Sequence, residues 1–286
     1  MNALQDDVRV LARRELPRLL AAIHDPPPRL HVRGAAPLDL LEGRLVAVVG
    51  ARACSAYGTT VARALARSLA EAGAVVVSGL ARGIDAAAHR GALDAGAPTV
   101  AVLGCGIDRD YPAAHAELAR QIRATGLVIS EYGPGVEPAP WRFPARNRII
   151  AGLCAATIVV EARARSGALI TADFALEEGR EVMSVPGEIT SALSQGTNQL
   201  IRIGAMPLTS VTEAIELLGF EPASSQGEAL PEPARELLEQ VREAPGDVDR
   251  LARALRRSAA DVATGLVELE LAGLVINVEG VYRVAA

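Results

Sequence analysis

Short apolar runs alternate with segments of helical spacing along the middle of the chain. The run 45–50 is continuously apolar, as expected of a strand buried on both faces. The segment 57–73 then places Val61, Leu65 and Leu69 on one helical face. The same reading predicts further strands at 74–79, 99–104, 127–131, 157–162, 181–187 and 207–210, and helices near 84–95, 113–124, 146–155 and 168–178.

Strands that alternate with helices of this length indicate right-handed βαβ units. The sequence therefore predicts an α/β fold, a Rossmann-like parallel sheet domain over residues 44–220. Residues 1–43 are too few for a separate domain, and we expect a short helical lead-in there.

The C-terminal part follows a different pattern. Residues 221–230 are rich in Pro, Ser and Gly and are predicted to form a linker. Residues 231–286 show three helical patterns followed by a hairpin, which is typical of a small winged-helix domain; the patterns cover 233–243, 247–256, 258–271 and 274–285.

Composition limits the class of protein. Half of the 286 residues are hydrophobic and 22% are charged, so a disordered chain is excluded. No apolar run reaches about 18 residues, so we expect no membrane span. The N-terminus lacks the apolar core of a signal peptide, and three scattered cysteines favour neither disulfides nor a metal site. The expected location is cytoplasmic.

Charge is distributed unevenly along the chain. All 29 basic residues are Arg, so any anion site must use guanidinium groups. The net charge is −5, yet residues 44–220 hold 16 basic and 16 acidic groups. The acidic excess lies mainly in residues 222–286, with 7 basic and 11 acidic groups.

The loops after the predicted strands carry the candidate chemistry. Ligands of open parallel sheets bind outside the carboxyl ends of the strands. Gly and Arg gather in these loops, and guanidinium groups suit phosphate oxygens. The arginines are Arg52, Arg82, Arg109, Arg142, Arg146, Arg148, Arg163 and Arg165.

A nucleotide cofactor is not expected at this edge. The first loop lacks the G-x-G-x-x-G pattern, and the second strand ends in Ser78-Gly79 instead of an acid for a ribose. A phosphate-binding P-loop is also missing. These loops therefore suit phosphates without a familiar cofactor.

Several side chains have two interpretations. Arg52 directly follows the first strand and is either a phosphate ligand or part of an ion pair. Phe143 stands within an Arg-rich loop, where its ring either anchors the loop and supports the pocket or contacts a ligand. Asn147 is either a ligand contact or a helix cap, and Arg148 either binds a ligand or pairs with Glu161.

Other positions suit either phosphate binding or helix capping. Ser166–Gly167 and Thr197–Asn198 each stand where a helix opens. Asp85 and His89 lie four residues apart, but no nucleophile has a base beside it. We expect no catalytic residue and no enzyme activity.

Eight motifs, in order, resemble the DNA processing protein A family (DprA, also called Smf). They span residues from the first loop to about Ile215: GARACSAYG, SGLARGIDAAAH, GAPTVAVLGCGIDRDYP, ISEYGPG, FPARNRIIAGL, VVEARARSGALITA, REVMSVPG and QGTNQLIRIGA. Two departures stand out. We expect this chain to lack the N-terminal sterile-alpha-motif-like domain of many members, and His115 replaces a more usual Asn.

The resemblance implies a homodimeric protein that binds and protects single-stranded DNA and loads the recombinase RecA onto it in natural transformation. Combined with the loop analysis, it gives eleven candidate DNA-binding residues. They are Arg52, Arg82, Arg142, Phe143, Arg146, Asn147, Arg148, Ser166, Gly167, Thr197 and Asn198.

An alternative is a nucleotide-processing enzyme of the phosphoribohydrolase type, which a PG…GT pattern weakly resembles. Gln199–Leu200 stand where that enzyme type carries its acid. The winged helix alone would suggest a transcription regulator. Its expected recognition helix carries Asp261 and Glu268 and no Arg, which disfavours sequence-specific reading of DNA.

Overall fold

The computed structural model describes residues 8–221, 231–271, 274–278 and 280–284. The chain forms two compact units, residues 1–223 and 224–286, and each has its own hydrophobic core. Most of the linker predicted at 221–230 lies outside the described residues. In the part that is described, no helix is long and apolar enough to cross a membrane.

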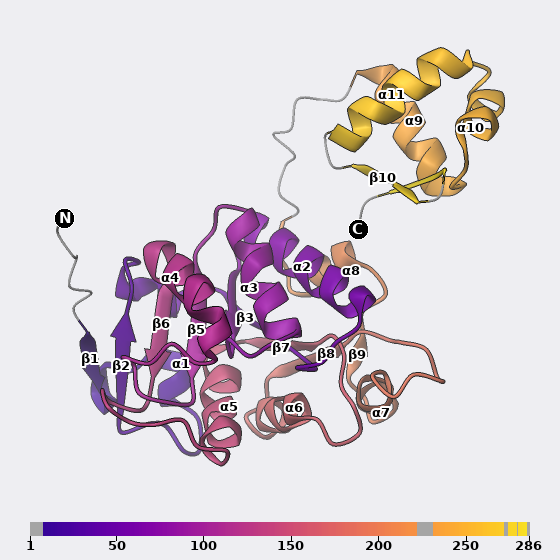
Figure 1. Ribbon diagram of the computed structural model, residues 1–286. Helices are drawn as coiled ribbons and strands as arrows, with labels where there is room; N and C mark the ends of the chain where they lie inside the picture. Colours follow the sequence, from indigo (N-terminus) through magenta and orange to yellow (C-terminus); the bar gives the residue numbers. More distant parts are fainter. Residues whose placement is uncertain (1–7, 222–230, 272–273, 279, 285–286) are drawn as a thin grey trace, which may run out of the picture. The chain divides into compact units, whose positions relative to one another are not determined.

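The described part of the first unit is built on a nine-stranded sheet with the order β1-β2-β6-β5-β4-β3-β7-β8-β9 (Figure 1). From β6 to β9 all neighbours are parallel, which confirms the predicted Rossmann-like sheet. The strands are β1 (Arg9–Ala12), β2 (Arg29–Arg33), β3 (Leu45–Val49), β4 (Val75–Ser78), β5 (Thr99–Leu103), β6 (Leu127–Ser130), β7 (Ala156–Val159), β8 (Glu181–Ser184) and β9 (Met206–Pro207).

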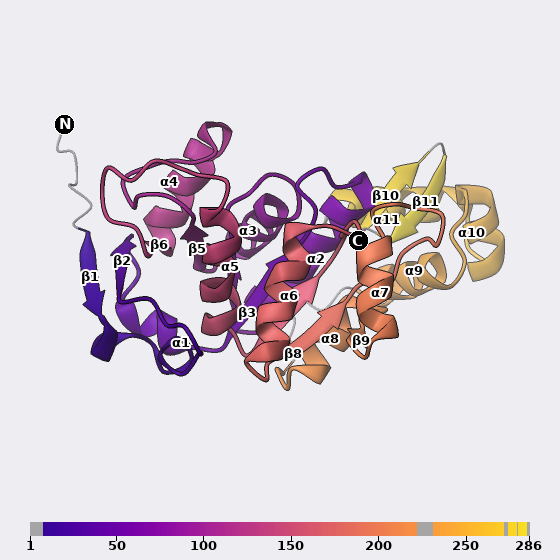
Figure 2. The ribbon, with the colours of Figure 1, turned by 90° about the horizontal axis from the view of Figure 1, so that it is seen from below.

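Helices cover both faces of the sheet, as Figure 2 shows from below. One face packs against α2 (Ala56–Glu71), α3 (Ile84–Asp94), α4 (Ala116–Thr125) and α8 (Val211–Leu217). The other packs against α1 (Arg18–Ala21), α5 (Arg142–Leu153), α6 (Gly167–Glu177) and α7 (Gln195–Arg202). Alternate residues of β3 enter the two cores, which explains its continuously apolar sequence.

The lead-in 1–43 differs from the helical prediction. Its described part contributes β1 and β2 to the sheet, and its helical pieces are only α1 and two short 3₁₀ segments, Arg13–Glu15 and Leu38–Glu42. Strand β2 pairs antiparallel with β6, and Leu30 and Val32 are fully buried. The free energy gained by covering the edge of β6 and burying these side chains exceeds the local preference for a helix.

The second unit contains the three predicted helices and the hairpin. They are α9 (Glu232–Glu243), α10 (Val248–Leu255), α11 (Ala259–Leu271), β10 (Val275–Val278) and β11 (Val281–Val284). Leu237, Val241, Leu251 and Leu266 form the centre of its core. The turn between β10 and β11 falls partly outside the described residues.

A buried carboxylate fixes the loop between β3 and α2. Glu161, just after β7, is 5% exposed. It accepts hydrogen bonds from the Ser55 backbone N–H at 2.9 Å and the Ser55 hydroxyl at 2.5 Å. A Cβ at Gly58 would lie 2.4 Å from this carboxylate, so only glycine fits there. Glu161 thus occupies the N-terminus of α2 and ties two neighbouring strands together.

We predict that Glu161→Ala lowers the free energy of unfolding by about 2–3 kcal/mol, because two partly buried donors of Ser55 lose their acceptor. Chemical denaturation of the full chain measures the loss. As a control, Glu188→Ala removes an exposed carboxylate and should change stability by less than about 0.5 kcal/mol. Similar small losses in both variants would contradict this account.

Candidate functional site

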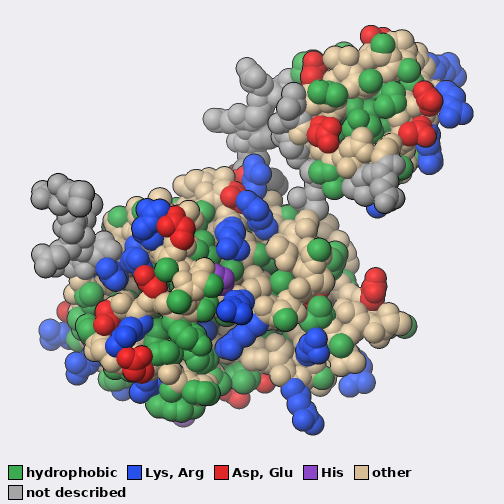
Figure 3. Space-filling model, in the orientation of Figure 1, with side chains coloured by type: hydrophobic (Ala, Val, Ile, Leu, Met, Phe, Trp, Pro, Cys, Tyr) green, Lys and Arg blue, Asp and Glu red, His purple; other side chains and the backbone are tan. Residues whose placement is uncertain are grey.

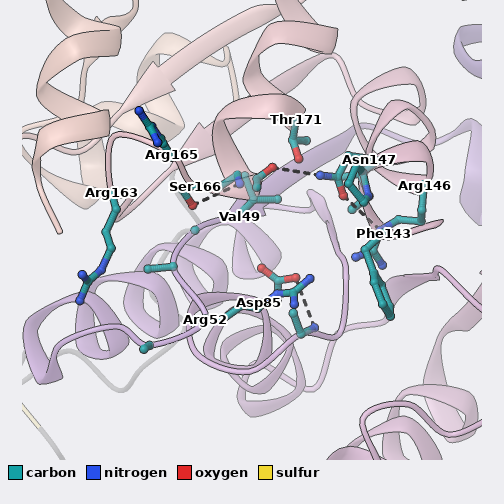
Figure 4. Close-up of a pocket in the computed structure, with 18 of the residues that line it drawn as sticks. Val49, Arg52, Asp85, Phe143, Arg146, Asn147, Arg163, Arg165, Ser166 and Thr171 are labelled. Atoms are coloured by element: carbon teal, nitrogen blue, oxygen red, sulfur yellow. Dashed lines mark hydrogen bonds between the residues drawn. The ribbon is translucent and has the colours of Figure 1, made fainter. Parts of the chain in front are cut away.

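The main cavity lies where the strand order reverses, between β3 and β7. The chain continues to opposite faces of the sheet after these two strands, which opens a crevice at their carboxyl ends. A cavity of about 630 Å³ fills this crevice (Figure 4). Its walls come from the loops after β3 and β7 and from the first turns of α3 and α5.

Three arginines at this cavity form no ion pair within the described part of the chain. Arg52 follows β3, and Arg163 and Arg165 follow β7. All three are exposed, and none forms an ion pair with a residue that the structure describes. Figure 4 shows Arg163 and Arg165 on one loop, with side chains that point in opposite directions, and Arg52 on another loop. Unpaired positive charge around a concave site attracts anions.

The N-terminus of α6 opens into the same cavity. Ser166 caps this helix, and its hydroxyl accepts the Ala168 N–H at 3.3 Å. A Cβ at Gly167 would meet no atom within 4 Å, so the backbone there is accessible. Thr171 also lines the cavity; it is 1% exposed, and its hydroxyl has no partner among the described residues. Free helix N–H groups beside an unpaired hydroxyl suit a phosphate.

The floor of the cavity holds a buried guanidinium without a carboxylate partner. Arg146 is 4% exposed and uses Nη1 to donate to the carbonyl oxygens of Gly79 and Val102. Its Nε donates to the Asn147 side chain at 3.2 Å. Burial lowers the pKa of Arg146 to about 10. The Asp85 charge acts on Arg146 without a direct ion pair, and Nη2 has no acceptor among the described residues, so this position suits a ligand that accepts hydrogen bonds.

Asp85 lies beside Arg146 on the floor and is 6% exposed. Its Oδ2 accepts the N–H groups of Gly79 at 3.2 Å and Ala81 at 3.3 Å. Burial raises the pKa of Asp85, while the Arg146 charge opposes that rise. A Cβ at Gly79 would lie 2.6 Å from Arg146 Nη2 and 2.7 Å from Asp85 Oδ2, so the two side chains meet over this glycine.

Aromatic rings form one wall. Phe143 stacks on Tyr111 with ring centroids 5.3 Å apart, and the Arg52 guanidinium lies 5.4 Å from the Phe143 centroid. A second cavity of about 390 Å³ shares both rings and also contacts Arg82. The 42% exposed Tyr111 therefore offers a flat surface at the boundary of two cavities.

A third cavity of about 420 Å³ adjoins the first at Arg165, Ser166 and Gly167. It lies between α6 and α7, where Gln199 and Ile203 line it. The three cavities share lining residues in sequence, so they form a continuous hollow along the carboxyl edge of the sheet.

Most of the candidate residues from the sequence line this hollow. Those in the first or second cavity are Arg52, Arg82, Phe143, Arg146, Asn147, Ser166 and Gly167. Arg142, Arg148, Thr197 and Asn198 line none of the three.

Two of these four are arginines that contact other groups. Arg142 lies over the rings of Tyr132 and Trp141, 5.1 Å and 4.7 Å from their centroids. Arg148 forms ion pairs with Glu131 at 2.6 Å and Asp25 at 2.9 Å, so the suggested pairing with Glu161 is wrong. Glu161 instead binds the start of α2.

The other two hold the loop after β8. The Thr197 hydroxyl donates to the Ser194 carbonyl oxygen at 3.1 Å, and Thr197 is 1% exposed. The Asn198 amide bonds both the N–H and the carbonyl oxygen of Gly187, at 3.1 Å and 3.0 Å. Helix α7 begins at Gln195, so neither residue is its cap.

The capping interpretation of Asn147 is wrong. Helix α5 begins at Arg142, and Pro144 lies in its first turn, where proline is tolerated. Asn147 therefore lies in the helix interior. Its Nδ2 donates to the Gly167 carbonyl oxygen at 3.0 Å. Asn147 therefore couples the floor of the cavity to the start of α6.

Sequence reasoning left several polar or aromatic cavity residues off the candidate set, among them Thr171. Arg163 and Arg165 were noted only as members of the arginine group, and Asp85 was considered only for catalysis. Tyr111 was not singled out, although its exposed position beside a proline could have drawn attention.

His89, the other residue weighed for catalysis, is part of the core. His89 is fully buried, its Nδ1 lies 2.9 Å from the Thr99 hydroxyl, and burial lowers its pKa to about 3. It is therefore neutral and lies away from the cavity lining. In the described residues, no group of three His, Cys, Asp or Glu side chains could hold a metal ion.

Two family models match the chain. Residues 7–219 match the model for DNA recombination-mediator protein A, and residues 221–280 match the DprA winged helix domain. The first match covers the sheet unit with its hollow, and the second covers most of the smaller unit.

Individual proteins and structures agree with these matches. DNA processing protein DprA of Streptococcus pneumoniae is 51% identical over 70% of this chain and 70% of its own length. Protein Smf of Escherichia coli is 42% identical over 93% of this chain and 74% of its length.

Two solved structures of DNA processing protein A are also similar. The one from S. pneumoniae has a TM-score of 0.70 and 46% identity, and covers 75% of both chains. The one from Helicobacter pylori, titled for its single-stranded DNA binding mode, has a TM-score of 0.69 and 29% identity, over 76% of this chain and 99% of that one. The resemblance read from the eight motifs is thereby confirmed, and this chain belongs to the DprA/Smf family of DNA processing proteins.

Proposed function

We propose that this protein binds single-stranded DNA in the hollow at the carboxyl edge of its sheet and loads the RecA recombinase onto it during natural transformation. Family membership supports the DNA-processing role, and the H. pylori relative is described as a binder of single-stranded DNA. RecA as partner follows from the family resemblance, and binding of labelled RecA to strand-loaded protein tests it.

The observation that carries the proposal is the set of unpaired cationic groups on this hollow. Arg146 lies on the floor without a carboxylate partner, and Arg52, Arg163 and Arg165 stand around it without ion pairs within the described chain. Together with the start of α6, they form a row of phosphate-binding groups. A single strand presents both repeated phosphates and free ring faces, which fits this row beside Phe143 and Tyr111.

The nucleotide-processing alternative is less favoured. Rossmann-like enzymes place a pyrophosphate at the start of the first helix of the fold. In this chain that position, the N-terminus of α2, holds the carboxylate of Glu161. Gln199 and Leu200 also supply no acid, and Leu200 is buried. Release of base from AMP by the purified protein would restore the alternative.

We assign the winged-helix unit a smaller role in strand binding. Exposed positions of α11 include Asp261, Thr264, Val267 and Glu268, which repel phosphate or lack charge. The three cavities of the sheet-edge hollow all lie within the first unit. We therefore assign strand affinity to the first unit.

We predict that Arg52→Ala and Arg165→Ala each weaken binding of an oligothymidine by about 1–3 kcal/mol, because a charge-assisted bond to phosphate is lost. Each should also reduce the salt dependence by about one counterion. Fluorescence anisotropy at several salt concentrations measures both. The matched control is Arg67→Ala, which removes an exposed arginine on α2 that pairs with Glu71. Equal weakening by the control would point to a general charge effect.

We further predict that a chain ending at residue 223 retains single-strand affinity within a few-fold of the full chain. The reason is that the hollow and its cationic groups belong entirely to the first unit, whereas residues 222–286 carry 11 acidic and 7 basic groups. The same anisotropy titration tests this, with light scattering to compare oligomeric state. A tenfold loss at unchanged oligomeric state would show that the winged helix holds DNA.

A homodimer is the third element of the proposal. Apolar side chains are exposed at the edge strand β9 (Met206, 38%), just after the end of α7 (Ile203, 61%) and at the end of α8 (Leu217, 44%). Exposed apolar side chains around an unpaired sheet edge favour self-association. We predict that Met206→Glu converts the dimer to a monomer in light scattering. The control Leu176→Glu, at an exposed apolar position of α6, should leave the dimer intact.

A further inference from the structure

Trp141 is the only tryptophan of the chain, and it lies outside the three cavities of the hollow. It precedes α5, in the loop that follows β6, and it is 63% exposed. The Arg142 guanidinium lies 4.7 Å from the centroid of its ring and 5.1 Å from the centroid of the Tyr132 ring. A ring exposed to this extent does not anchor a loop to a core. Its open surface is available to a ligand that stacks on aromatic rings.

The loop that carries Trp141 is fixed by its contacts with the loop after β5. The Ile107 N–H donates to the Tyr132 carbonyl oxygen at 3.2 Å. Arg109 and Glu137 form an ion pair between the two loops at 2.6 Å. The fold therefore holds the Trp141 ring in place before a ligand arrives, which lowers the entropy lost when a flat group stacks on it.

Arginine side chains stand beyond this loop, at the same edge of the sheet. Strand β2 runs antiparallel to β6, so Arg29, its first residue, lies at the carboxyl end of β6. Strand β1 runs antiparallel to β2, which brings Arg13 and Arg14, just after its end, to that same edge. The loop and β2 are neighbours, because a Cβ on Gly133 would lie 3.4 Å from the His31 ring. The hollow, the Trp141 loop and the three arginines therefore follow one another along the carboxyl edge.

Arg13, Arg14 and Arg29 are exposed, and none of them forms an ion pair with another described residue. Figure 3 shows basic side chains at this end of the first unit, over β1 and β2. The acidic side chains of the adjoining loops already have hydrogen-bond or ion-pair partners, so three positive charges remain available to an anion. These partners are the Ala12 N–H for Glu15, Arg148 for Asp25 and Glu131, Arg123 for Asp110, and Arg109 for Glu137.

We propose that a single strand longer than the hollow continues past the loop after β6 and stacks one base on Trp141. Its phosphates then contact Arg13, Arg14 and Arg29, which together with Trp141 form an outer strand surface. The inference rests on the proposed function, because it extends the path of the same strand. A single strand supplies a ring and a phosphate at every nucleotide, which matches an exposed ring beside unpaired cations. A duplex keeps its base faces stacked inside, so it cannot use the Trp141 ring.

The first test uses the wild-type full chain, because emission from its only tryptophan reports on Trp141 alone. The chain is titrated to saturation, as judged by anisotropy, with an oligothymidine of about 20 nucleotides and with an abasic oligomer of the same length. We expect the oligothymidine to quench most of the emission by stacking. The abasic oligomer presents phosphates without rings and should leave the emission nearly unchanged. Unchanged emission with saturating oligothymidine would overturn the proposal.

The second test measures affinity at two strand lengths. Trp141→Ala should bind the oligothymidine of about 20 nucleotides about tenfold more weakly, in line with the loss of one base stacked on an aromatic ring. The combined variant Arg13→Ala, Arg14→Ala and Arg29→Ala should also weaken this binding and reduce its salt dependence by about two counterions. An oligothymidine of about six nucleotides occupies the hollow alone and should bind both variants within about twofold of wild type.

The matched control for the arginines combines Arg67→Ala, Arg120→Ala and Arg235→Ala, three exposed positions that each pair with a glutamate on their own helix. It changes the net charge equally, yet it should bind both oligomers within about twofold of wild type, because distant exposed charges are screened by salt. Weakening by the control that equals the weakening by the test variant would show a general charge effect and overturn the assignment of the three arginines.

Trp141→Phe keeps an aromatic ring and should bind the long oligomer within about threefold of wild type. Together with thermal melts, this variant separates loss of stacking from loss of folding. Wild-type protein that binds neither oligomer would refute the proposed function. Strand binding that is indifferent to Trp141 and to the three arginines would refute only this inference.

Discussion

The buried guanidinium of Arg146 is the constraint on which the rest of the site depends. A charge at 4% exposure has to be held by neutral acceptors, and the carbonyl oxygens of Gly79 and Val102 supply them. This arrangement requires glycine at position 79, where a side chain would collide with Arg146 and Asp85. It also leaves Arg146 Nη2 without an acceptor among the described residues, in a side chain that lines the main cavity.

The position of the Glu161 carboxylate is the second feature that determines which helix start is open to an anion. Glu161 is placed at the start of α2, where it closes the phosphate position that many Rossmann-like proteins use. The start of α6 remains open, with a glycine that has free space around it and the buried hydroxyl of Thr171 beside it. One carboxylate thus closes the position at the first helix of the fold, and the start of a helix on the opposite face is left open to an anion. The same sheet therefore suits an extended polyanion better than a bound nucleotide.

The sequence by itself determined the architecture and the location of the site. Continuous apolar runs at 45–50 and 99–104 required strands buried on both faces, and helical spacing between them required parallel pairing. Parallel strands bring their following loops to one edge, so Arg52, Arg146 and Ser166 were predicted there together. Eight motifs in the family's order were specific enough to indicate the family from the sequence alone.

Tertiary structure decided which of these residues are available to a ligand. Arg146 and Arg148 carry the same charge and stand only two residues apart, so the sequence cannot distinguish them. In the structure, Arg148 forms ion pairs with Glu131 and Asp25, whereas Arg146 forms none with a described residue. Likewise, Asn147 entered a helix interior, and β1 and β2 joined the sheet against a local helical pattern. In each case the outcome depends on groups distant in sequence. The burial of a side chain and its ion pairs depend on tertiary contacts, which neighbours along the chain do not determine.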